Sequence, residues 1–292
     1  MKSKNKLLAT ILILTICSIA YRLIVLGNYS RTSLMFVGLP ALCAFLVVKY
    51  TKKPTYKNKA FFYSMTLFLL CASIILGEGT VCILFASPIF YGIGGIIVWL
   101  DKIIVKKDQT RKFSFSGIIV LMLVSSMIDY SVPSQGIVIE EELVIDEVVH
   151  ISDLNQQPNF KKNLPSFFEI GFPMPQGING EGLNKGDLRK IDFLSSTKGL
   201  GTLELMVKDK TGQMIVFEPV SDNTHVGSWL RWKEAKVELQ YFEGGKTLIK
   251  WTSKFDCRLS PSWYFVPIER YAVGLMNEHL IKSYFPEAKP LK

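Results

Sequence analysis

Hydrophobic residues follow two different patterns along this chain. Up to residue 128 they form five apolar runs separated by short polar loops, and after residue 129 they alternate with polar residues over short stretches. An α-helix rises about 1.5 Å per residue, so roughly 17–25 apolar residues cross the hydrocarbon of a bilayer. The first pattern therefore predicts an all-α transmembrane bundle in residues 1–129, with about five helices at 7–26, 32–48, 60–77, 80–100 and 113–128. The second, third and fifth runs are near the lower length limit.

Basic residues are concentrated in alternate loops of this region. The N-terminus and the second and fourth loops carry three, five and five lysines or arginines, whereas the first and third loops carry one and none. Because cytoplasmic loops are enriched in Lys and Arg, we expect a cytoplasmic N-terminus and an extracytoplasmic C-terminal half, as in an integral protein of a bacterial cytoplasmic membrane. Residues 1–128 carry a net charge of +12 and residues 129–292 a net charge of −3. The overall positive charge is therefore a membrane signal, and no nucleic-acid partner is expected.

The second half, after a linker at residues 130–136, has the pattern of an α+β domain. A β-like stretch at 137–145 is followed by two short helices, within 146–154 and 161–170, and then by a loop rich in Gly and Pro. Successive strands are predicted at 188–193, 200–208, 213–220, 229–242 and 246–257. Glu243–Gly245 forms the hairpin turn between the last two. A final helix reaches Tyr284, and its expected apolar stripe comprises Ile268, Tyr271, Ala272, Leu275, Met276 and Leu280.

Three stretches of this domain resemble the SRPBCC superfamily, also called START-like or polyketide cyclase/dehydrase-like. They are EEELVIDEVV at 140–149, GDLRKIDF at 186–193 and GGKTLIKW at 244–251. The resemblance covers residues 137–285. The chain also resembles a subgroup of this superfamily in which such a domain follows membrane helices. It implies a helix-grip domain in residues 137–292, an antiparallel curved sheet around the long C-terminal helix, with a cavity for an apolar or amphipathic small molecule. The family has no universal catalytic motif, so no catalytic residue is carried over.

Residues expected to line such a cavity lie on the inner sides of the strands and of the last helix. The candidates are Arg189, Tyr241, Trp251, Ser253, Phe255, Leu275 and Met276. Trp251 and Phe255 are equally compatible with ordinary core packing. Arg189 and Ser253 share the parity of apolar neighbours, and if they point inward they would orient a carboxylate or hydroxyl group, because a buried polar group must be paired. For Arg189 a surface position is the favoured alternative.

Other reactive side chains show no arrangement typical of an active site. His225 could act as a general base, but it has no nucleophile nearby in the sequence, and a surface histidine is favoured. Cys257 could be a nucleophile, but a core thiol is favoured. The run Glu140–Glu142 could bind calcium, but adjacent strand residues point to opposite faces, which favours a solvated strand. No Cys/His spacing typical of a metal site is present, so we expect neither metal nor cofactor.

Three functions fit these patterns. The leading hypothesis is a membrane-anchored helix-grip protein that binds or transfers a hydrophobic, lipid-like small molecule next to the bilayer. The second is a cyclase, dehydrase or hydrolase that uses the same cavity. The third is a structural or partner-binding ectodomain whose interior is filled by its own side chains.

Overall fold

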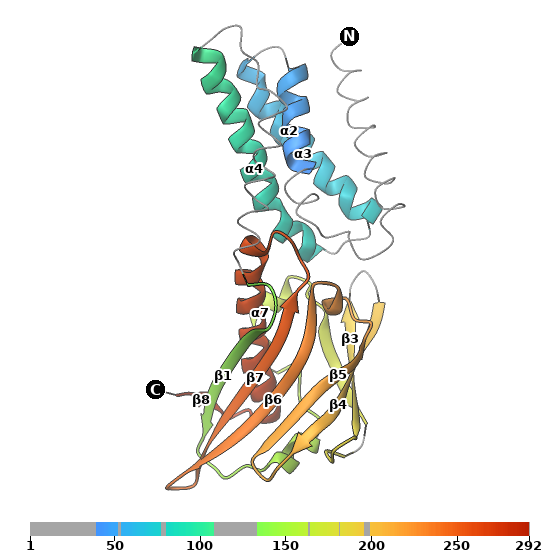
Figure 1. The fold of residues 1–292 in the computed structure, drawn as a ribbon, viewed down its shortest axis with the longest axis vertical. Helices are drawn as coiled ribbons and strands as arrows, with labels where there is room; N and C mark the ends of the chain where they lie inside the picture. The colour runs from blue at the N-terminus through green and yellow to red at the C-terminus, as the bar shows by residue number, and fades with distance from the viewer. Residues whose placement is uncertain are drawn as a thin grey trace. The chain divides into compact units, whose positions relative to one another are not determined.

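The chain divides into two compact units, residues 1–132 and residues 133–292, which we call the helical unit and the sheet unit. The computed structural model describes residues 39–51, 54–76, 80–107, 133–162, 164–180, 182–195 and 199–291 (Figure 1). Each unit is described by itself below.

The helical unit contains three described helices, α2 (Leu39–Tyr50), α3 (Pro54–Leu76) and α4 (Thr80–Lys107). The predicted spans at 32–48, 60–77 and 80–100 fall partly or wholly on these helices, and α4 continues seven residues past the predicted end. The predicted spans at 7–26 and 113–128 lie outside the described residues. Within the part of the chain that the structure describes, no helix is long and apolar enough to cross a membrane.

The sheet unit is built on one eight-stranded sheet in the order β2-β3-β4-β5-β6-β7-β1-β8, with every described pair antiparallel. The strands are β1 (Ile137–Ile145), β2 (Met174–Asn179), β3 (Leu188–Ser195), β4 (Gly199–Lys210), β5 (Met214–Asp222), β6 (Leu230–Phe242), β7 (Lys246–Cys257) and β8 (Lys289–Pro290). The predicted strands at 137–145, 229–242 and 246–257 are confirmed to within one residue, and the other three correspond to β3, β4 and β5 with shifted ends.

Turn residues and bulges account for the shape of the sheet. Gly244 and Gly245 both have positive φ, 89° and 77°, which allows the tight turn between β6 and β7. The register shifts within the β2–β3, β4–β5 and β6–β7 pairs. Such bulges bend and twist the strands that carry them, which curves the sheet.

The remaining helices are η2 (Ile151–Asn155), α6 (Ser166–Glu169), η3 (Val226–Ser228) and α7 (Ser262–Tyr284). Both helices predicted between β1 and β2 are much shorter than expected. Pro158 follows η2 closely and Pro165 immediately precedes α6, and proline disfavours a continuous helix because it lacks an N–H and restricts the residue before it.

The long helix α7 packs on β1 and β7 (Figure 1), so the sheet unit has the helix-grip arrangement expected from the sequence. Around the C-terminal end of α7, Ile281 and Phe285 belong to the main apolar core. Most other members come from β1, β4, β5, β6 and β7 and from the η2 region, and include Leu143, Leu154, Val207, Ile215, Val237, Ile249 and Trp251.

The predicted apolar stripe of α7 is displaced by about one residue, although its member Leu280 does pack against the main core. Tyr271 is 58% exposed, whereas Glu269 is 6% exposed. The buried face is formed by Phe265, Val266, Glu269, Val273, Gly274, Asn277 and Ile281. Three of these residues, Glu269, Gly274 and Asn277, are polar or lack a side chain. Hydrophobic periodicity therefore predicted the adjacent, more apolar positions of the helix as its inner face.

Candidate functional site

The N-terminal half of α7 places an unusual set of groups against the sheet. Gly274 lies so close to β1 that a Cβ atom there would be 2.9 Å from Oε1 of Glu141. The absence of a side chain therefore gives a carboxyl group room between helix and sheet. Glu141 follows the inward parity of Ile139 and Leu143, as its pairing with the inward-facing Trp251 requires.

The run Glu140–Glu142 is divided between the two faces of the sheet. On the outer face, Lys250 forms ion pairs with Glu140 at 2.6 Å and with Glu142 at 3.4 Å. On the inner face, burial and then the nearby charge of Glu278 raise the pKa of Glu141. Within the described residues no group of three acids, histidines or cysteines is placed to hold a metal ion.

Asn277 and Ser253 tie α7 to the sheet. The Ser253 hydroxyl donates to Oδ1 of Asn277 at 2.7 Å, and the Asn277 amide donates to the carbonyl of Ile139 at 3.2 Å. Asn277 is 1% exposed. Ser253, which was predicted to line the cavity, therefore points inward as expected. Its hydroxyl group donates its hydrogen bond to Asn277 of the protein itself.

Glu269 is the most perturbed acid of the interface. Burial raises its pKa from 4.5 to about 8, while the nearby thiol of Cys257 acts more weakly in the opposite direction. That thiol is a weak hydrogen-bond partner, and no other described group lies within hydrogen-bond geometry of either carboxyl oxygen. At neutral pH the group is therefore mostly a protonated carboxyl, able both to donate and to accept a hydrogen bond.

Two indole groups add to the unpaired polar atoms inside the sheet unit. The Nε1 atoms of Trp232 and Trp251 are buried and have no hydrogen-bond partner among the described residues. Trp232 lies edge-on to Phe255 with ring centroids 6.1 Å apart, and Trp251 stacks on Tyr284 at 6.4 Å. The hydroxyl of Thr252 on β7 is a third buried atom without a partner among the described residues. Buried polar atoms in native proteins are nearly always paired with protein or ordered water, so these groups require an explanation.

His225 differs from its prediction in two ways. It is 6% exposed, so it is not a surface residue. Its Nδ1 lies 3.2 Å from Oγ of Ser195, a potential nucleophile at the end of β3. The two residues are 30 positions apart in the chain, so local spacing in the sequence gave no sign of the pair. Asp222 orders the loop before His225 by accepting hydrogen bonds from the N–H and hydroxyl of Thr224.

Aromatic rings connect this histidine to α7. His225 contacts Trp229 with ring centroids 4.8 Å apart, and Trp229 contacts Phe172 at 5.8 Å. Phe167 lies 5.0 Å from Phe172 and 5.2 Å from Tyr271 of α7. This aromatic cluster links α6, η3 and α7 near the end of the sheet where Leu230 pairs with Cys257.

The remaining predicted site residues occupy several environments. Arg189 is buried, contrary to the favoured surface position, and donates to Oδ1 of Asn155 at 2.9 Å and to the carbonyl of Leu154 at 3.2 Å. Tyr241 is 37% exposed, and its hydroxyl donates to the carbonyl of Val149.

The candidates on β7 and α7 also differ in burial. Phe255 is fully buried and Trp251 is 8% exposed. Leu275 and Met276 are half-buried on α7, outside its buried face. The structure thus brings Trp251, Ser253 and Phe255 together on the inner face of β7, and it adds Glu141, Trp232, Glu269 and Asn277, which sequence reasoning missed.

Comparison with known proteins gives matches only among solved structures, since no family model and no curated protein matches the chain. A START superfamily protein from Mycobacterium smegmatis is 11% identical, with a TM-score of 0.34 and coverage of 50% of this chain and 92% of that chain. Truncated norcoclaurine synthase from Thalictrum flavum is 11% identical, with a TM-score of 0.34 and coverage of 52% and 95%. The Zhui aromatase/cyclase from Streptomyces sp. R1128 is 11% identical, with a TM-score of 0.30 and coverage of 50% and 94%. With identities and TM-scores this low, neither the ligand nor the reaction of these proteins can be assigned to this chain.

Proposed function

We propose that the sheet unit binds an amphipathic small molecule between α7 and the inner face of the sheet. The observation that carries this proposal is a set of poorly satisfied buried polar groups on the helix and strands that face each other. The indole N–H groups of Trp232 and Trp251 have no partner among the described residues, and the Glu269 carboxyl has only the weakly hydrogen-bonding thiol of Cys257. Leaving a buried polar group unpaired costs about 1–3 kcal/mol, so a bound molecule that pairs with them would recover part of that cost.

The chemistry of these groups defines the kind of ligand. A protonated Glu269 pairs with a hydroxyl, carbonyl or ether oxygen, and the two indole N–H groups need acceptors. The surrounding Val266, Val273 and Phe255 are buried hydrocarbon surfaces. A largely apolar molecule with a few uncharged oxygen atoms fits this environment, because a protonated carboxyl and indole N–H groups pair with such atoms.

Native mass spectrometry of a fragment starting at Pro133 tests the proposal. The wild-type fragment should carry a small molecule that is lost on denaturation, and Glu269→Leu should carry much less of it. Arg270→Leu is the matched control, because Arg270 is the exposed neighbour on the same helix and should retain the bound mass. A wild-type fragment without added mass, also after exposure to a lipid extract, would contradict binding and favour an interior filled by its own side chains.

A second candidate function, catalysis by the sheet unit, is favoured by the Ser195–His225 contact. A serine within hydrogen-bond reach of an imidazole is the first requirement for nucleophilic catalysis. Glu269, with a pKa of about 8, is in the range suited to acid–base catalysis near neutral pH. Hydrolysis of p-nitrophenyl butyrate that disappears in both Ser195→Ala and His225→Gln would support an enzyme. Activity that survives Ser195→Ala would exclude this pair.

The helical unit, in this proposal, attaches the protein to a bilayer with the N-terminus in the cytoplasm and the sheet unit outside. The five apolar runs and the alternating lysines support this arrangement. So do the exposed apolar side chains of α3 and α4, including Phe62 at 56%, Leu70 at 59% and Trp99 at 60% exposure, because soluble surfaces rarely gather such residues. A C-terminal alkaline phosphatase fusion should be active and a C-terminal green fluorescent fusion dark. The reverse result would place the sheet unit in the cytoplasm.

A further inference from the structure

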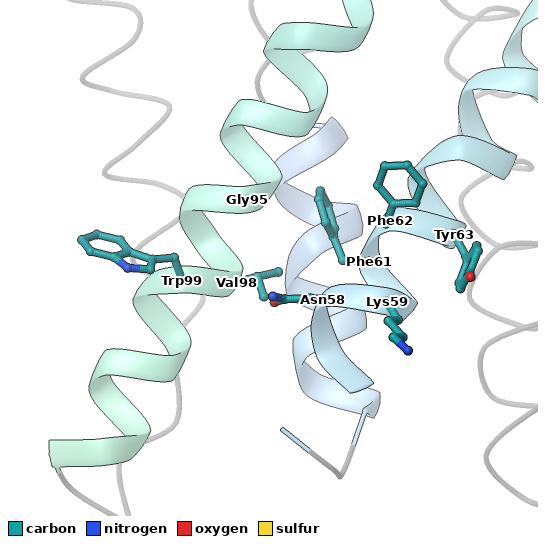
Figure 2. A pocket seen from close by; sticks show the side chains of 8 residues that line it. All are labelled: Asn58, Lys59, Phe61, Phe62, Tyr63, Gly95, Val98 and Trp99. Carbon is teal, nitrogen blue, oxygen red and sulfur yellow. The ribbon is translucent and has the colours of Figure 1, made fainter. Parts of the chain in front are cut away.

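The helical unit contains a groove between α3 and α4. It has a volume of about 450 Å³ and is lined by Asn58, Lys59, Phe61, Phe62, Tyr63, Gly95, Val98 and Trp99. Figure 2 shows Asn58 and Lys59 below Phe61 and Phe62 on α3, with Val98 of α4 beside Asn58. The groove therefore combines one cationic, hydrogen-bonding end with an aromatic and aliphatic wall.

Two adjacent glycines of α4 have different effects on this groove. A Cβ atom on Gly94 would collide with the ring of Phe61, so Gly94 lets the two helices approach. A Cβ atom on Gly95 would meet nothing within 4 Å, so Gly95 leaves the groove open. The wall beside them is fixed by Tyr91, which stacks on Phe62 at 5.4 Å and hydrogen-bonds to Thr66 at 2.7 Å.

The sequence that flanks the groove-lining turns is strongly basic. The groove is lined by the first turns of α3 and by the later turns of α4. Residues 49–59 and 100–107, which flank these turns in the sequence, contain eight lysines and one acid, Asp101. Lysine clusters beside apolar helices attract anionic lipid headgroups.

We propose that this groove binds an anionic phospholipid, with its phosphate at Lys59 and Asn58 and an acyl chain along Phe61, Phe62 and Val98. The inference rests on the bilayer attachment proposed above and adds a specific ligand to it. Six of the eight lining residues are aromatic, aliphatic or glycine, so a free phosphate ion would find few partners there. An anionic lipid matches both the cationic end, Lys59, and the apolar lining.

The test uses the full chain purified in a neutral detergent and analysed by native mass spectrometry with added phosphatidylglycerol or phosphatidylcholine. The wild type should retain phosphatidylglycerol at several-fold lower lipid concentration than phosphatidylcholine. Gly95→Phe, which fills the groove, should lose this retention. Gly92→Phe is the matched control: it lies on the same helix with equally open space but outside the lining, and it should behave as wild type.

A charge variant separates the two ends of the site. Lys59→Gln should weaken phosphatidylglycerol retention and leave phosphatidylcholine unchanged, and it keeps the test decisive if Gly95→Phe loses helix content by circular dichroism. Equal retention of both lipids by the wild type, or unchanged retention in a folded Gly95→Phe, would overturn the proposal. Competition by inorganic phosphate would also overturn it by assigning the site to a free anion. Because retention is measured in detergent, a failure here is distinct from a wrong topology, which the fusion proteins report.

Discussion

Replacing Glu269 by Gln should change how the stability of the sheet unit depends on pH. The carboxyl has a pKa of about 8 in the folded protein and an ordinary value of 4.5 when exposed. Its pKa is raised on folding, so its contribution to stability is fully present below about pH 4.5 and is lost as the pH rises through about 8. One pKa unit corresponds to about 1.36 kcal/mol, so about 3 kcal/mol is lost by pH 7 and about 5 kcal/mol above pH 8. The side chain is 6% exposed, so little screening by solvent reduces these values.

Urea unfolding of a fragment starting at Pro133, followed from pH 4.5 to 9, measures this effect. The Gln side chain has nearly the same shape and no charge, so the free energy of unfolding of Glu269→Gln should lack this decline. The difference between variant and wild type should grow with pH, whatever constant offset the buried amide introduces.

Glu243→Gln, in the exposed turn after β6, controls for the loss of one carboxylate from the domain. Parallel pH profiles for wild type and Glu269→Gln would refute the reasoning, because they would mean that the carboxyl ionises as it does in water and that the interface around it is hydrated.

Three further results are expected. A fragment of residues 137–292 should fold alone as a mixed α/β domain, and a circular dichroism spectrum without secondary structure would contradict this. Phe255→Ala should lower the free energy of unfolding by about 3–5 kcal/mol, the core range, because Phe255 is fully buried; a much smaller loss would place it on an open pocket. Arg189→Met should cost about 1–3 kcal/mol in urea unfolding because the buried carbonyl of Leu154 and the amide oxygen of Asn155 lose their donor. An unchanged midpoint would show that water replaces the guanidinium.

The sheet was largely predictable because its pairing is local. Strands β3 to β7 follow one another as hairpins, so alternation and turn residues such as Gly244 located them without knowledge of distant contacts. β2 was missed because the Pro and Gly residues of Met174–Asn179 are typical of a loop. β8 is only two residues long and exists only because it pairs with Leu143 and Val144.

The candidate site was less predictable because its residues break the patterns on which sequence reasoning depends. A buried Glu269, Gly274 and Asn277 look like the polar side of a helix, and only the contacts with β1 and β7 reveal them as its inner face. The pairing of Ser195 with His225 depends on how the end of β3 meets the loop before η3, which no local pattern encodes. For Arg189, parity correctly allowed an inward position, but its partners Leu154 and Asn155 come from a distant turn.

The proposal that a small molecule lies between α7 and the sheet is tested most directly at the indole groups themselves. Proton–nitrogen NMR spectra of the fragment starting at Pro133 should be recorded as purified, and again after denaturation, removal of small molecules and refolding. The Nε1–H signals of Trp232 and Trp251 should shift between the two samples, while that of Trp263, in the first turn of α7, should stay in place. Identical spectra from a sample that had carried a bound molecule would show that the ligand lies elsewhere and contradict the proposed site.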